Sequence, residues 1–476
     1  MKKRPSFGWR KHRVHCAGRT NALGDQAMTS SALHPFSIPD FRCYWLARFL
    51  AVIATMSMVV VIAWQVYDIA RTDYGMSPKQ AAFQLGLLGL FQFVPLALLT
   101  PVAGWAADRF ERRRVAICAN IIDAGAALAL GLLTYYDALN LPLLFMLAAM
   151  HGTARVFVGP SMGAIAPNIV PPESRPRAIA LSSIAWQSAS VIGPAVGGLI
   201  YAQNPAGSYW MTVALLLLSS ITLAMVRPVY PPPMDAGKHP VRLMIEGMKY
   251  TFSERFLLGA ITLDLFAVLL AGATALLPVY ARDILHVGVD GLGQLRAAPA
   301  LGAAIVAIYL AFRPLKDNVG VKMLWAVVVF GLATIGFGFS HIIGDAVFGN
   351  AKIDFLDMAA PMAIALSMLI ILGAADMLSV YVRSSLVQLN TPDAMRGRVS
   401  SVSGLAISAS NELGELQSGF AAAFLGPVGA VVFGGAGAIV ITGVWAKLFP
   451  ELKNAKTFEP QFRQELNILP VKEAII

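Results

Sequence analysis

Residues 104–115 read GWAADRFERRRV, a short polar loop that carries four arginines. An apolar stretch lies on each side, at 81–106 and at 115–135. Each is long enough to cross the hydrocarbon core of a bilayer, which takes about 20 residues of helix. Ten more such stretches predict an all-α membrane protein with 12 transmembrane helices, near 44–67, 81–106, 115–135, 141–165, 178–201, 208–226, 255–280, 292–312, 321–340, 359–383, 399–422 and 426–445.

The composition agrees with a membrane protein and excludes a large water-soluble enzyme. Hydrophobic residues make up 57% of the 476 residues and charged residues 13%, whereas soluble domains are about a quarter charged. The net charge of +10 is concentrated on one side of the predicted helices. With the N-terminus inside, inner segments hold 29 Lys and Arg and outer loops hold 4. The positive-inside rule therefore predicts a multi-pass protein of the cytoplasmic membrane with both termini cytoplasmic.

The longest polar interruption divides the chain into two groups of six helices. We expect a basic cytoplasmic tail at 1–37, a first bundle at 38–226, a linker at 227–254, a second bundle at 255–446 and a cytoplasmic C-terminal tail at 447–476. The two halves repeat each other: Arg175 and Gly193 recur as Arg396 and Gly414, each 221 residues later. The segments QVYDI, from residue 65, and PVYARDI, from residue 278, also correspond. Repeats of this kind are typical of secondary transporters, whose substrate site lies between the halves.

The loop at 104–115 resembles the major facilitator superfamily, whose signature at this place is G-x-L-x-D-R-x-G-R-R. The matching residues are Gly104, Asp108, Arg109, Arg112 and Arg113, whereas Ala106 and Glu111 depart from it. The resemblance implies two pseudo-symmetric six-helix bundles and a gating role for this loop. A carboxylate here could pair with a neighbouring helix end or an arginine. The alternative is a plain positive-inside loop.

Two further motifs resemble the same family. In the fourth predicted helix, Arg155 and Gly159 match its Arg-x-x-x-Gly pattern. His151, one turn earlier, is interpreted as a packing or pore-lining residue, with a proton carrier as the alternative. The fifth helix resembles the antiporter signature of exporting members through Gly193, Pro194, Gly197 and Gly198, with a small-residue packing face as the alternative. Stretches at 263–285, 374–400 and 411–419 resemble the enterobactin-exporter branch, which is grouped with drug–proton antiporters.

A secondary transporter needs a group within the membrane that exchanges protons, and intramembrane ionisable residues are candidates for that role. Asp264 and the Glu412–Glu415 pair are predicted near the midplane. The full candidate set for proton coupling is Asp264, Glu412, Glu415, Arg155, Asp123 and Arg48. Asp376 is expected to pair with Arg383 in a structural role. Candidate cavity residues are Gln65, Gln92, Trp186, Gln187 and Tyr280, although these side chains would equally suit packing.

The sequence thus predicts a proton-coupled exporter of a small amphipathic compound, such as a catecholate siderophore or a drug-like molecule, that works by alternating access. No phosphate-binding loop of the G-x-x-x-x-G-K-[ST] type occurs, so ATP hydrolysis is not expected. No catalytic residue, metal, cofactor or nucleic acid is expected, and the chain is expected to act as a monomer in the lipid bilayer. The alternatives are a lysophospholipid flippase, an uptake facilitator and, more remotely, a non-transporting sensor.

Overall fold

The computed structural model describes residues 34–230, 240–348, 352–353 and 358–458. The first half consists of six long helices: α1 (Pro39–Thr72), α2 (Pro78–Arg109), α3 (Arg112–Tyr135), α4 (Leu141–Ile165), α5 (Arg175–Gln203) and α6 (Pro205–Ala224). Short 3-10 turns η1 (Pro35–Ser37), η2 (Ala166–Asn168) and η3 (Pro172–Ser174) accompany them. Several helices begin at a residue suited to that position. Ser77 forms a capping box with Gln80, and Asn140 accepts the amide of Leu143.

The second half repeats the arrangement with one interrupted helix. Its elements are α8 (Arg255–Leu270), η4 (Ala273–Leu276), α9 (Leu277–Val279), η5 (Tyr280–Ile284), α10 (Gly288–Phe312), α11 (Val319–Gly338), α12 (Ser340–Phe348), α13 (Ala360–Leu389), α14 (Asp393–Leu448) and α15 (Pro450–Asn454). Two-residue strands β1 (Lys352–Ile353) and β2 (Met358–Ala359) pair antiparallel, a small addition to the expected all-helical fold. The amphipathic α7 (Pro240–Ser253) precedes this half.

The described residues contain 11 helices that are long and apolar enough to cross a membrane. This number is consistent with the predicted 12 crossings, because α14 contains both of the last two predicted stretches. Gly426 separates them with φ +78° and ψ 164°, a left-handed backbone that glycine adopts without steric cost. Most helices extend a few residues beyond their apolar stretches. Helix α1, for example, covers 39–72 instead of 44–67.

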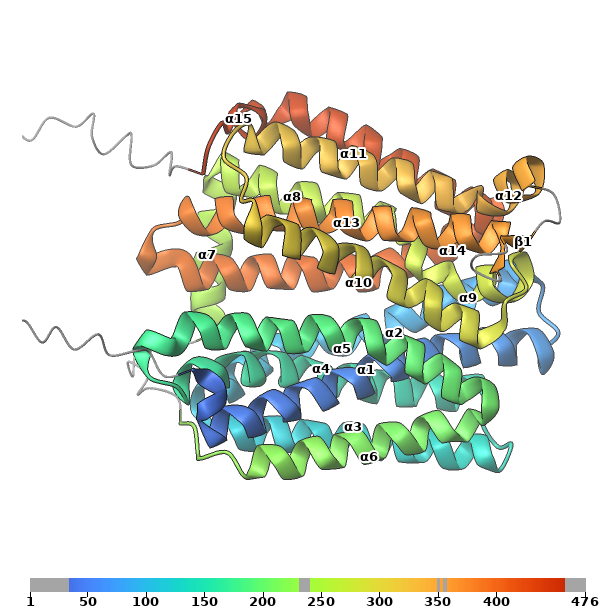
Figure 1. The fold of residues 1–476 in the computed structure, drawn as a ribbon, viewed down its shortest axis with the longest axis horizontal. Coiled ribbons are helices and arrows are strands. Elements are labelled where there is room, and N and C mark those ends of the chain that lie inside the picture. Colours follow the sequence, from blue (N-terminus) through green and yellow to red (C-terminus); the bar gives the residue numbers. More distant parts are fainter. Residues whose placement is uncertain (1–33, 231–239, 349–351, 354–357, 459–476) are drawn as a thin grey trace, which may run out of the picture.

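The two halves lie side by side, with α5 next to α10 and α2 next to α14 where they meet (Figure 1). Both ends of the described chain lie at the left of that view, where α7 is also found. We call the opposite end, with the turns at 73–77, 136–140 and 285–287, the outer end. The positive-inside rule predicts that it faces the outside. The all-α fold is therefore confirmed, whereas the domain limits and the sidedness stay predictions.

Candidate functional site

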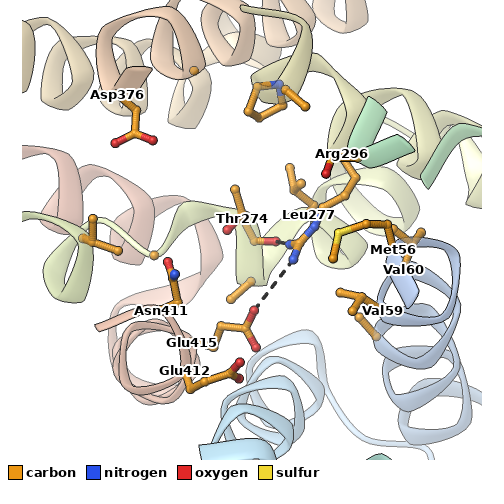
Figure 2. A pocket seen from close by; sticks show the side chains of 18 of the residues that line it. Met56, Val59, Val60, Thr274, Leu277, Arg296, Asp376, Asn411, Glu412 and Glu415 are labelled. Atoms are coloured by element: carbon orange, nitrogen blue, oxygen red, sulfur yellow. Dashed lines mark hydrogen bonds and ion pairs between the residues drawn. The ribbon is translucent and has the colours of Figure 1, made fainter. Parts of the chain in front are cut away.

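A cavity of about 640 Å³ lies between the two halves, within the usual range for ligand pockets (Figure 2). Helices α1, α2, α4 and α5 line it from the first half, and α10, α13, α14 and the interrupted seventh span line it from the second. Most lining side chains are apolar. The charged members are Arg155, Arg296, Asp376, Glu412 and Glu415.

Two loose ion pairs form the centre of the cavity. An oxygen of Glu412 lies 3.7 Å from Nη1 of Arg155, which also donates to the amide oxygen of Gln92. An oxygen of Glu415 lies 3.9 Å from Nη2 of Arg296. The predicted glutamates, three residues apart, therefore share one face of α14. Of the two candidate basic partners, Arg155 lies beside Glu412 and Arg48 does not, whereas the sequence gave Arg296 no role.

The interruption of the seventh span shapes the wall beside Arg296. Helix α8 ends at Leu270, and the chain resumes through η4. A side chain at Gly272 would clash with the carbonyl of Gly414 on α14, so glycine is required for this approach. The carbonyl of Thr274 in η4 accepts the amide of Leu277 and also a hydrogen bond of 2.9 Å from Nη1 of Arg296. Discontinuous helices commonly form the substrate sites of transporters.

Asp264, a predicted coupling residue, lies apart from the cavity. It is buried and forms an ion pair with the buried Arg383 on α13. The expected pairing of Asp376 with Arg383 is therefore wrong, because α8 lies against α13 and supplies a nearer carboxylate. Asp376 instead faces the cavity.

Asp123 also lies apart from the cavity, in the core of the first half. Its carboxylate is 2.7 Å from Nδ1 of His151, and both side chains are buried. His151 therefore does not line the cavity, and the choice between a packing residue and a proton carrier stays a prediction. Arg48 donates to the hydroxyl of Tyr44, 3.0 Å away and one turn earlier on α1. Neither predicted coupling residue, Asp123 or Arg48, is brought to the glutamates.

The predicted cavity residues fall into two groups. Gln92, Trp186 and Gln187 line the cavity, and Gln187 also donates across the two halves to the carbonyl of Ala300 on α10. Gln65 and Tyr280 lie elsewhere. Gln65 is buried between the hydroxyls of Thr134 and Tyr209, and Tyr280 is buried with its hydroxyl on the carbonyl of Gly338.

The residues at the end of loop 104–115 anchor the start of α3 to the end of α6. Arg113 donates to the carbonyls of Ala224 and Val226, at 3.0 and 2.5 Å, and so satisfies the last turn of α6. Glu111, which replaces the family's glycine, is buried between Arg113 and Arg114, both 2.7 Å away.

Among the described residues, no hydrogen bond or ion pair joins the rest of this loop to the second half. Arg112 bonds to the carbonyl of Ala107, and the Arg109 guanidinium lies 5.7 Å from the Trp105 ring. The Asp108 side chain is outside the described part of the structure. The gating role of this loop stays a prediction.

The glycines of α5 allow close helix contacts on two sides. Side chains at Gly193 and Gly197 would clash with α1, at Met56 and Ser57. A side chain at Gly198 would meet the carbonyl of Val289 on α10, in the other half, at 2.7 Å. Pro194 lies in the same stretch and is buried. Gly193 and Gly197 thus bring α5 against α1, and Gly198 brings it against α10 near the outer end.

A set of ion pairs joins the halves at the outer end, and we call it the outer clasp. Asp68 on α1 pairs with Arg282 of η5. Asp283 of η5 accepts hydrogen bonds from Tyr67 and, at 3.1 Å, from Arg71 on α1. All five residues lie in or next to the corresponding segments QVYDI and PVYARDI. The end of the first span thus binds directly to its counterpart in the other half.

At the cytoplasmic end, four glycines of the described chain lack close contacts with neighbouring helices. Side chains at Gly104, Gly159, Gly163 and Gly404 would meet nothing within 4 Å. The glycines Gly86 and Gly419, on α2 and α14 toward the outer end, are by contrast close enough for direct backbone contact. The halves are therefore held together mainly at the outer end.

Curated proteins similar to this chain include "Enterobactin exporter EntS" of Escherichia coli (strain K12) and of Shigella boydii. Each is 24% identical over 424 residues, which cover 89% of this chain and 95% of the relative.

Similar solved structures include a D-xylose-proton symporter (TM-score 0.63, 14% identity, 88% of this chain and 99% of that one). A bacterial homolog of the human lysosomal transporter Spinster gives a TM-score of 0.60 at 18% identity, with 87% and 96% covered. At these identities the structures show the fold alone.

The family profile described as Major Facilitator Superfamily matches residues 44–415. That match covers most of the chain, including α1 to α6 and the charged cavity on α10, α13 and α14. Together with the apolar helices and the bacterial relatives, it indicates a multi-pass protein of the cytoplasmic membrane. The chain belongs to the Major Facilitator Superfamily of transporters.

Proposed function

We propose that this protein is a proton-coupled exporter that moves a small amphipathic compound, a catecholate siderophore or a drug-like molecule, out of the cytoplasm. The observation that carries the proposal is the pair of glutamates in the cavity between the halves. Glu412 lies beside an arginine of the first half and Glu415 beside an arginine of the second. A proton that binds to either glutamate weakens one of these pairs, which links protonation to the relative position of the halves.

Three other features support export rather than uptake. The glycines and the proline of α5 follow the antiporter-like pattern, and Gly198 is in contact with α10 across the halves. The similar curated proteins are named as exporters of enterobactin. In addition, the outer clasp and the outer glycine contacts favour a state whose cavity is reached from the cytoplasmic end, where an exporter takes up its substrate.

The proposal is tested with everted membrane vesicles energised to an acid-inside pH gradient, which a fluorescent dye follows. Catecholate siderophores and lipophilic drugs are added in turn. We expect one class to collapse the gradient in vesicles that contain the wild-type protein. Glu415→Gln should abolish the collapse, because glutamine keeps the shape of the side chain without exchanging a proton.

The matched control is Asp345→Asn, which removes an exposed aspartate on α12 away from the cavity. It should leave the collapse unchanged. Substrate-driven collapse that persists in both Glu412→Gln and Glu415→Gln would contradict the coupling role of the pair. Accumulation of a compound in right-side-out vesicles energised by an inward proton gradient would contradict the direction.

A further inference from the structure

Asp376 is the one cavity carboxylate without a partner among the described residues. It lies on α13, and Figure 2 shows its carboxylate directed into the cavity, well separated from Glu412 and Glu415. Glu412 and Glu415 each have an arginine within 4 Å. Neither a hydrogen bond nor an ion pair involves Asp376 in the described chain. A carboxylate in such a place is costly unless something else neutralises it.

The nearby cations are already engaged. Arg383, two turns along α13, is paired with Asp264. Arg155 and Arg296 lie beside the two glutamates and also donate to Gln92 and to the carbonyl of Thr274. None of these three arginines forms an ion pair with Asp376 in the described structure.

The charges that line the cavity consequently do not balance. Three carboxylates and two guanidinium groups face it, so the fully ionised cavity carries one surplus negative charge. Apolar and aromatic side chains line the same cavity, among them Leu372 and Met377 on α13, Phe330 on α11 and Trp186 on α5. A low-dielectric cavity with one uncompensated negative charge attracts a single positive charge. The aromatic side chains suit the apolar body of such a compound and can also contact a cation.

We propose that Asp376 binds the cationic group of the transported compound, so that the substrate is an amphipathic monocation, a protonated amine or a quaternary onium with an apolar body. The inference rests on the proposed exporter function and narrows its substrate class toward cations and away from anionic catecholates. It also balances the charge when a proton is exchanged for the cationic substrate. A proton on the glutamate pair removes the surplus charge and favours release of the cation, whereas loss of that proton restores the site.

The test compares two probes of nearly equal shape and opposite charge, tetraphenylphosphonium and tetraphenylborate. Equilibrium binding to the purified full-length protein in detergent is measured by isothermal titration. We expect the wild-type protein to prefer the cation by at least about tenfold, because the Coulombic attraction between a carboxylate and an onium charge in a cavity is worth about 10- to 100-fold in affinity. This comparison needs no substitution, so it stands even if a variant fails to fold.

Variants then assign the preference to one residue. Asp376→Asn should weaken binding of tetraphenylphosphonium by about 10- to 100-fold and should not weaken that of tetraphenylborate. Asp376→Glu should restore most of the affinity, and Asp345→Asn should behave as wild type. Thermal unfolding of each purified variant verifies that it is folded.

Equal or tighter binding of tetraphenylborate by the wild-type protein would overturn the inference, and so would unchanged cation affinity in a folded Asp376→Asn variant. Failure of the exporter proposal is a separate result. Cation binding through Asp376 without any substrate-dependent collapse of the pH gradient would refute proton-coupled export but not the binding role. Gradient collapse by an anionic catecholate alone would support proton-coupled export but would overturn the assignment of a cationic substrate.

Discussion

Weakening the outer clasp should shift the protein toward a state that is open at the outer end. Asp68 and Asp283 hold the clasp, and the double variant Asp68→Asn and Asp283→Asn removes the negative charge from each of its ion pairs. The Asp68 and Arg282 side chains are 37% and 25% exposed, and those of Asp283 and Arg71 are 20% and 28% exposed. The pairs are thus intermediate between surface and buried ones.

The magnitude follows from that intermediate exposure. Exposed ion pairs contribute about 0.2–1 kcal/mol, and hydrogen bonds to charged groups contribute about 1.5–3 kcal/mol. A value between these ranges, about 1–1.5 kcal/mol for each aspartate, gives about 2–3 kcal/mol for the double variant. Since 1.4 kcal/mol is a factor of ten, the ratio of outer-closed to outer-open protein should fall by about 30- to 150-fold.

The population can be read from the labelling rate of a cysteine inside the cavity. Ala63→Cys, in a background in which the native Cys16, Cys43 and Cys118 are serine, places a thiol in the cavity lining of α1. In right-side-out vesicles a membrane-impermeant maleimide reaches it only when the outer end opens. The labelling rate should rise with the open fraction.

The control exchanges the two charges of one clasp pair. Asp68→Arg combined with Arg282→Asp, with Asp283 unchanged, rebuilds the pair in reverse and should give a labelling rate close to that of the wild-type protein. Asp345→Asn should not change it. Equal labelling rates in the wild-type protein and the double asparagine variant would refute the conclusion that the clasp holds the outer end closed.

Three further substitutions test the packing between and within the halves. Gly89→Leu places a side chain against the backbone of α14 at Glu412 and should lower stability by about 1–3 kcal/mol, seen as a lower thermal midpoint than that of the lipid-facing control Gly125→Leu. Asp264→Asn leaves the buried Arg383 unpaired and should cost about 3–5 kcal/mol, largely restored when Arg383→Met is added. Gly404→Leu should leave stability unchanged but slow labelling of Ala63→Cys from outside, because it obstructs closure of the cytoplasmic end. A faster rate would contradict this.

The sequence predicts the architecture well because the bilayer imposes a simple rule on helix length. Apolar stretches of about 20 residues locate the helices, and the spacing of Glu412 and Glu415 places both on one face of α14. The break after Leu270 is not predicted, since the residues around it stay apolar. Gly272 packs directly against α14 at the break, and Gly272 and Pro278 are its signals in the sequence.

The wrong predictions concern ion pairs between side chains on different helices. Asp376 and Arg383 are seven residues apart on one helix, so sequence spacing favours that pair, yet Arg383 turns toward Asp264 on α8. The same limit hides the role of Arg296, whose partner lies more than 100 residues away on α14. Such pairs depend on how each helix is rotated about its axis, and the spacing of residues within one helix carries no information on that rotation.

The glycines give the clearest indication of how the halves move. A glycine in a helix lowers stability by about 0.5–1 kcal/mol relative to alanine. Its presence therefore indicates a close contact that a larger side chain would block. At the outer end Gly86, Gly198 and Gly419 form such contacts across the halves. At the cytoplasmic end Gly159 and Gly404 form none. We expect Gly159 and Gly404 to form their contacts only after the outer clasp opens. The halves then rock about the charged cavity, and each set of glycines packs closely in one of the two closed states.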